Sequence, residues 1–168
     1  MFLIKYENPL QFFSRVVLIF AILMTVIKFW HYSKRILIEY INNVVEDLLT
    51  VILAWAVLLP LISIVYSPLW FWIFTYGVMY IINGFRCSYS YKRMKKENNN
   101  YYTSIFRRWT FHALIYGISL ILISPLVYFV ETEHPSFTYM IGILLGIIII
   151  LITLHAILDI EILERKIT

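Results

Sequence analysis

The chain has little charge and almost no cysteine. Only 14% of its 168 residues are Asp, Glu, Lys or Arg, and it contains one cysteine, five glycines and five prolines. A single cysteine excludes an internal disulfide framework and every metal motif that needs several cysteines. The low glycine and proline content excludes collagen-like and linker-like chains. Because 61% of the residues are hydrophobic, the chain is also too apolar for a disordered protein or an ordinary soluble domain.

Long uncharged stretches are what the sequence has in abundance. Residues 48–85, 109–130 and 135–158 contain no Asp, Glu, Lys or Arg, and about 20 apolar helical residues cross the hydrocarbon core of a bilayer. The first stretch is long enough for two helices, and Ser67-Pro68 marks the break, because proline disfavours helix in the residue before it. The sequence therefore predicts an all-α integral membrane helical bundle.

Five transmembrane helices are expected, and the first is the least regular. Arg15 and Lys28 bracket an uncharged core of 12 residues, although the long stems of both side chains can carry their charges to the interface. The alternative is an amphipathic segment on the membrane surface, which leaves four spans. The single transmembrane domain 1–168 is expected to hold spans at about 10–30, 48–66, 69–85, 109–130 and 137–158, with a cytoplasmic basic loop at 86–108.

Lys and Arg are distributed unevenly between the two sides of this topology. Twelve of the 14 fall on the side of segment 86–108 and the C-terminus, and only Lys5 and Arg15 fall on the other. Because basic residues are retained in the cytoplasm, we expect the N-terminus outside and the C-terminus in the cytoplasm. The abundance of Ile, Lys, Asn and Tyr indicates an AT-rich genome, which favours a bacterial cytoplasmic membrane.

Segment 86–108 carries seven Lys or Arg and one Glu. Orientation of the chain in the membrane is sufficient to explain such charges. The alternative is docking to anionic lipid headgroups or to a protein. We expect no nucleic-acid partner, because no recognition module fits in 23 residues. The candidates for lipid or partner binding are Lys92, Arg93, Lys95, Lys96, Arg107 and Arg108.

A polar segment precedes the second span. Apolar and polar side chains recur at helical spacing on opposite sides of Ile36 to Asp47, which predicts an amphipathic helix that leads directly into that span. Its polar face either lies in water and headgroups or lines an inner cavity of the bundle. That face is formed by Glu39, Asn42, Asn43 and Glu46.

Three side chains are weak candidates for a metal or proton-transfer site. His155 and Asp159 share a helix face, because they are four residues apart, and His112 is expected at a similar depth in the fourth span. No histidine pair has the spacing of a zinc-protease helix, and His and Asp are common at helix ends. We therefore expect no metal and no cofactor.

Gly142 and Gly146 form a small-residue motif in the fifth span. Such residues let two helix backbones approach closely. We expect the fifth helix to make the closest packing contact, either within the bundle or with a partner.

Three classes of function compete. The favoured one is a small polytopic membrane protein that acts through helix–helix or lipid interactions, as an accessory subunit, an exclusion or assembly factor, or a toxin-immunity type. Its expected partners are lipids and another membrane protein or a second copy. The alternative is a transporter or channel subunit for apolar cargo, since charged groups are absent from the middles of the later spans. The second alternative is an inner-interface lipid-modifying enzyme; enzyme activity is disfavoured, since no catalytic motif is found.

Overall fold

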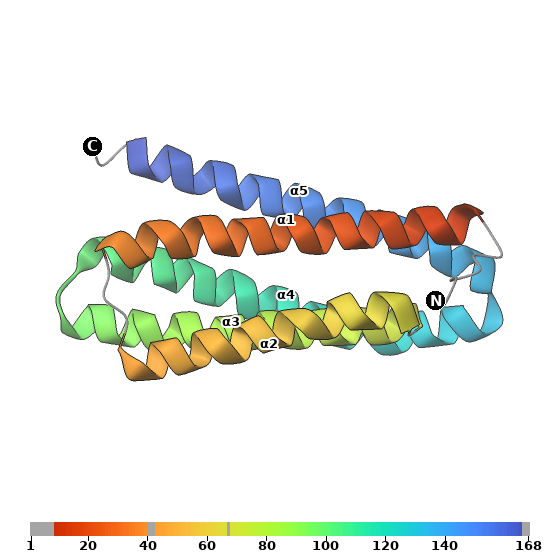
Figure 1. Ribbon diagram of the computed structural model, residues 1–168, viewed down its shortest axis with the longest axis horizontal. Helices are drawn as coiled ribbons and strands as arrows, with labels where there is room; N and C mark the ends of the chain where they lie inside the picture. Colours follow the sequence, from red (N-terminus) through yellow and green to blue (C-terminus); the bar gives the residue numbers. More distant parts are fainter. Residues whose placement is uncertain (1–8, 40–42, 67, 166–168) are drawn as a thin grey trace, which may run out of the picture. The chain divides into compact units, whose positions relative to one another are not determined.

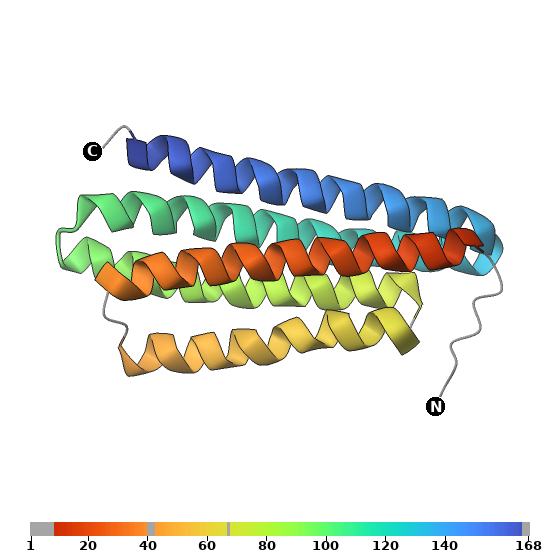
Figure 2. The same ribbon diagram turned by 45° about the horizontal axis from the view of Figure 1, so that its top comes forward.

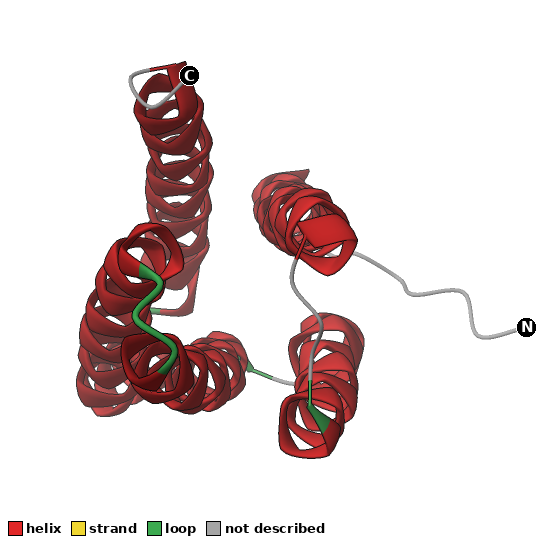
Figure 3. Ribbon diagram, turned by 90° about the vertical axis from the view of Figure 1, so that its left-hand side faces the viewer, coloured by secondary structure: helices red, strands yellow, loops and turns green. Residues whose placement is uncertain are grey.

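The computed structural model describes residues 9–39, 43–66 and 68–165, and of residues 29–39, 65–66 and 156–165 it describes the helical backbone only. The described chain consists of helices joined by short connections, with no strand (Figure 3). The predicted all-α fold is confirmed. The helices are α1 (Pro9–Glu39), α2 (Val44–Tyr66), α3 (Leu69–Lys96), α4 (Asn100–Glu133) and α5 (Pro135–Arg165) (Figure 1).

Four of the described helices are long and apolar enough to cross a membrane. The qualifying segments are Pro9–Lys28, Val44–Ile64, Asn100–Glu133 and Pro135–His155. The first belongs to α1, for which a surface position was the alternative. The third expected span, in α3, is not among them. Within the expected span 69–85 the polar residues Thr75 and Asn83 are buried within the protein, and polar side chains between packed helices are common in membrane proteins.

By its internal contacts the chain divides into two compact units. Unit 1 comprises residues 1–39 and 130–168, and unit 2 comprises residues 40–129, so that the boundary falls inside α4. In unit 1 the packed pair is α1 and α5, which run in the same direction (Figure 1). In unit 2 α2 packs against α3 as an antiparallel pair (Figure 2).

Small side chains line the packing face between α1 and α5. A Cβ atom added at Gly146 of α5 would lie 2.6 Å from Cγ1 of Val17 in α1, so a larger residue would force the Val17 side chain or the helices to shift. Close approach at small residues is the usual way in which helices pack in a membrane. The buried positions are Ser14, Leu18, Ala21, Ile22 and Thr25 on α1, and Thr138, Gly142, Gly146, Ile149 and Thr153 on α5.

The helix α3 is the most buried helix of unit 2. It meets α2 on one side, where the Ser63 and Thr75 hydroxyls lie 3.3 Å apart, and α4 on another. A Cβ atom at Gly77 would lie 2.9 Å from the backbone oxygen of Gly117 in α4. The two backbones therefore touch at a glycine pair, which the sequence analysis did not single out because the two residues come from different helices.

Two helices contain a proline in their interior, Pro60 in α2 and Pro125 in α4. Pro125 in α4 has no N–H for the carbonyl of Ile121, and the Ser124 hydroxyl donates to that oxygen at 2.9 Å instead. The break expected at Ser67-Pro68 is confirmed, because α2 ends at Tyr66 and α3 begins at Leu69.

The prediction of a loop over 86–108 is wrong for most of its length. Helix α3 continues to Lys96, and α4 begins at Asn100. Lys, Arg and Met are good helix formers, and Cys87 and Met94 bury one face of this extension. We call residues 86–108 the basic hairpin from here on.

Three consecutive asparagines make the turn of the basic hairpin. Asn98 has a φ of 56°, the left-handed conformation that Asn tolerates better than most residues. The N–H groups of Asn98 and Asn99 donate to the carbonyls of Lys95 and Met94 at 3.4 and 3.1 Å, which closes the end of α3. The Asn99 side chain then accepts the N–H of Tyr102 at 3.2 Å and caps α4.

The expected lead-in helix over 36–47 is also divided in the structure. Residues up to Glu39 belong to α1, and α2 begins only at Val44, after Asn43. The reason is a helix cap at Asn43, whose side chain bonds to the backbone of the next turn instead of continuing a helix. Glu39 and Asn42 have side chains outside the described part of the chain.

Candidate functional site

The first turn of α2 is closed by a reciprocal pair of hydrogen bonds. The backbone N–H of Glu46 donates to Oδ1 of Asn43 at 2.9 Å, and the backbone N–H of Asn43 donates to Oε2 of Glu46 at 3.0 Å. This arrangement is a capping box, with Asn43 as the N-cap residue and Glu46 three residues later. It satisfies two of the N–H groups that the start of a helix leaves unpaired.

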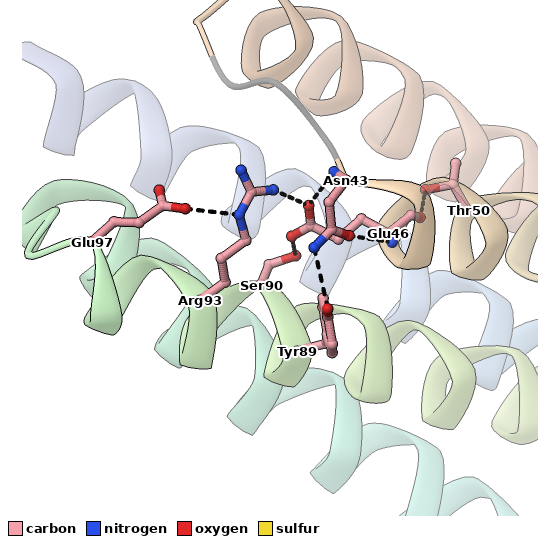
Figure 4. Close-up of polar contacts among 7 residues, drawn as sticks. All are labelled: Asn43, Glu46, Thr50, Tyr89, Ser90, Arg93 and Glu97. Carbon is pink, nitrogen blue, oxygen red and sulfur yellow. Dashed lines mark hydrogen bonds and ion pairs between the residues drawn. The ribbon is translucent and has the colours of Figure 1, made fainter.

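The Glu46 carboxylate also reaches across to α3. Its Oε1 accepts the hydroxyl of Ser90 at 2.7 Å, and its Oε2 lies 2.6 Å from Nη1 of Arg93 (Figure 4). The Nε of Arg93 donates to Glu97 at 2.8 Å. Glu46 is fully buried, whereas 26% of the Arg93 side chain is exposed. A carboxylate at this depth is stable only because charged and neutral donors surround it.

Two further bonds complete the contact. The Asn43 amide donates to the Tyr89 hydroxyl at 3.1 Å, and the Thr50 hydroxyl donates to the backbone oxygen of Glu46 at 2.7 Å. We call the set Asn43, Glu46, Tyr89, Ser90 and Arg93 the helix clamp, because it fastens the start of α2 to the extension of α3. With donors at both oxygens, the Glu46 carboxylate serves as a structural ion-pair partner and not as a free base.

The sequence analysis missed the helix clamp. Glu46 was expected on a polar face that lies in water and headgroups or lines an inner cavity, and Arg93 was among the candidates for lipid or partner binding. The local part was visible in the sequence, because an Asn followed three residues later by a Glu before an apolar run is a helix-start signal. The pairing of Glu46 with Ser90 and Arg93 was not visible in the sequence, because these residues lie 44 and 47 positions away.

The other candidates in the basic hairpin have exposed side chains. Lys92 is on the outer face of α3, and Lys95 and Lys96 are in its last turn. Arg107 and Arg108 are exposed on α4. The structure therefore separates Arg93, which is held by Glu46 and Glu97, from five cations that face outward.

Two of the three candidate metal ligands have exposed side chains and belong to different units. His112 is exposed on α4 in unit 2, and His155 is exposed on α5 in unit 1. The Asp159 side chain lies outside the described residues. Within the described part, no group of three His, Cys, Asp or Glu side chains is placed to hold a metal ion.

The glycine candidates lie at the face where α5 meets α1. Gly142 and Gly146 are both buried, and Gly146 is the one that contacts Val17. The buried hydroxyl side chains Thr138 and Thr153 extend the same face in both directions.

Comparison of the chain with protein families, with curated proteins and with solved structures finds no match.

Proposed function

We propose that the chain is a small polytopic membrane protein that acts by binding other membrane components, as an accessory subunit, an exclusion or assembly factor, or an immunity-type protein. In this proposal it resides in a bacterial cytoplasmic membrane with its N-terminus outside and its C-terminus and basic hairpin in the cytoplasm. The uneven distribution of Lys and Arg supports this orientation.

One observation carries the proposal: buried polar side chains are engaged in bonds within the protein, with the Thr153 hydroxyl as an exception among the described residues. The buried carboxylate of Glu46 is occupied by the helix clamp. The buried hydroxyls of Thr25, Ser63 and Ser124 donate to backbone oxygens of their own helices at 2.9–3.1 Å. A transporter or enzyme instead keeps polar groups available to its substrate.

The surface that is left for partners is apolar along the helices. On α4 a stripe of large side chains is 43–69% exposed and recurs every three or four residues, which puts them on one side of the helix. Such a stripe fits either lipid chains or another transmembrane helix, and the proposal assigns it to a helix of a partner. Its members are Phe111, Ile115, Ile118, Leu122, Leu126 and Phe129.

The test is photo-crosslinking in the native membrane with benzoylphenylalanine at single positions. We expect discrete protein adducts from positions 111, 118 and 122 on the stripe. The matched control is Ile123, which is also apolar and 37% exposed but lies about 100° around the helix from Leu122. Equal yields at all four positions, or lipid adducts alone, would contradict a helix partner. Solute flux or substrate turnover by the purified chain alone in vesicles would favour the transporter or enzyme alternatives.

A further inference from the structure

Five basic side chains of the basic hairpin have no acidic partner among the residues that the structure describes. Lys92, Lys95, Lys96, Arg107 and Arg108 are all exposed, and none of them forms an ion pair with any residue that the structure describes. Arg93 differs, because it bridges Glu46 and Glu97. Of the seven basic residues of the hairpin, the structure thus separates Arg93, which serves the fold, from these five exposed ones, whereas Arg86 is partly buried.

The register of α3 against α4 places Lys92 close to the level of Arg107. The Cβ position of Gly77 is 2.9 Å from the Ile121 side chain, and that of Gly84 is 2.7 Å from the Leu114 side chain. The same antiparallel register, continued toward the turn, sets Lys92 at the level of Phe106, which precedes Arg107.

This level coincides with the end of the apolar part of the hairpin. Arg107 and Arg108 directly precede Trp109, where the uncharged run of α4 begins. Lys95 and Lys96 follow Lys92 by one turn of α3, which is about 5 Å along the helix axis. The headgroup layer on each side of a bilayer is roughly 5–8 Å thick, which is comparable with the distance between Lys92 and the last turn of α3.

The chemistry of the side chains suits phosphate. The guanidinium groups of Arg107 and Arg108 present parallel donors that match two oxygens of a phosphate, and the lysines add point charges around them. Basic residues next to a membrane are attracted by anionic lipids. We infer that Lys92, Lys95, Lys96, Arg107 and Arg108 form a binding surface for the phosphate groups of anionic phospholipids. This inference rests on the membrane location proposed above and names the lipid class that the basic hairpin binds.

The test uses the full chain, purified in a mild detergent and titrated with phosphatidylglycerol or phosphatidylcholine of the same acyl chains. Native mass spectrometry measures the apparent affinity for each lipid. We expect the anionic lipid to bind at least tenfold more tightly, and the Arg107→Gln/Arg108→Gln variant to lose about fivefold or more of that preference. The matched control is Lys92→Arg/Lys95→Arg/Lys96→Arg, which keeps every charge and should keep the preference. Circular dichroism checks that each variant retains its helices.

Equal affinity for the two lipids, or an unchanged preference in the glutamine variant, would overturn the inference. Complete displacement of phosphatidylglycerol by millimolar pyrophosphate would also overturn the inference, because the surface would then bind a soluble phosphate compound. A separate measurement tests the proposed location: if alkaline carbonate releases the native chain from its membrane, the proposed function fails as well. If the chain stays in the membrane but shows no lipid preference, only the proposed lipid-binding surface is contradicted.

Discussion

The carboxylate of Glu46 and the guanidinium of Arg93 lie 2.6 Å apart, although the two residues are separated by 47 positions in the sequence. Each residue also has a local partner, since Glu46 caps α2 through Asn43 and Arg93 binds Glu97. The pair therefore ties the first turn of α2 to the last turns of α3. Removal of either side chain leaves the other without the ion pair in a largely buried position.

The first prediction is that Glu46→Ala destabilises the protein by about 2–3 kcal/mol, because it removes a buried ion pair and a helix cap. This loss of stability is smaller than that for a fully buried ion pair, because part of Arg93 reaches solvent. The measurement is thermal or denaturant unfolding of the purified chain in detergent. The matched control is Glu97→Gln, which removes the exposed partner of the same arginine and should cost about 0.5 kcal/mol or less. Equal losses in the two variants would show that the helix clamp does not stabilise the fold.

Much of the helical architecture was predictable, because a bilayer imposes a strict length and composition on the segments that cross it. The uncharged stretches at 109–130 and 135–158 correspond to α4 and α5, and Ser67-Pro68 correctly separates α2 from α3. Proline chemistry and span length are local properties, and a sequence displays them directly.

The extension of α3 into the basic hairpin was not predicted, because charge was used to mark the end of each span. A charged residue ends the apolar part of a helix without ending the helix, since Lys and Arg have good helix propensity. The polar character of α3 was missed for a related reason. Buried Thr75 lies against Ser63 of α2, and such a contact between helices leaves no periodic signal in a single sequence.

The second prediction concerns the glycines of α3. Gly77→Ala should destabilise the protein by about 1–2 kcal/mol, because the new Cβ meets the backbone oxygen of Gly117 at 2.9 Å, and two helices must separate to admit it. Gly84→Ala should be nearly neutral. Its Cβ meets side-chain atoms of Leu114, Cδ2 at 2.7 Å and Cγ at 2.9 Å, which a change of rotamer can move, and alanine has the better helix propensity by about 1 kcal/mol.

Unfolding midpoints of these two variants in the same detergent provide the measurement. The substitution and the helix are the same in both, so the difference isolates the nature of the neighbouring atom. A Gly84→Ala variant that is as unstable as Gly77→Ala would contradict this explanation.

The third prediction concerns the turn of the basic hairpin. Asn98→Ala should cost about 1 kcal/mol, since alanine has no side-chain compensation for a positive φ. Asn98→Gly should keep or slightly raise the stability, because glycine adopts this conformation freely. Asn100→Ala is a suitable control, as Asn100 is the first residue of α4 and is exposed. If Asn98→Ala and Asn100→Ala have the same unfolding midpoint, the left-handed turn does not limit the stability of the hairpin.

The fourth prediction concerns the proposed orientation of the chain. Reporter fusions after Asn98 and at the C-terminus should both give a cytoplasmic signal, and a fusion between Glu131 and Ser136 should give an external one. The physical reason is that twelve of the 14 Lys and Arg fall on one side of the topology, and basic residues are retained in the cytoplasm during insertion. Paired reporters, alkaline phosphatase for the outside and a fluorescent protein for the inside, make each position its own control. An external signal after Asn98 would reverse the orientation and would place the proposed lipid surface in the outer leaflet. A cytoplasmic signal between Glu131 and Ser136 would mean that α4 does not cross the membrane, although its length and composition permit it to do so.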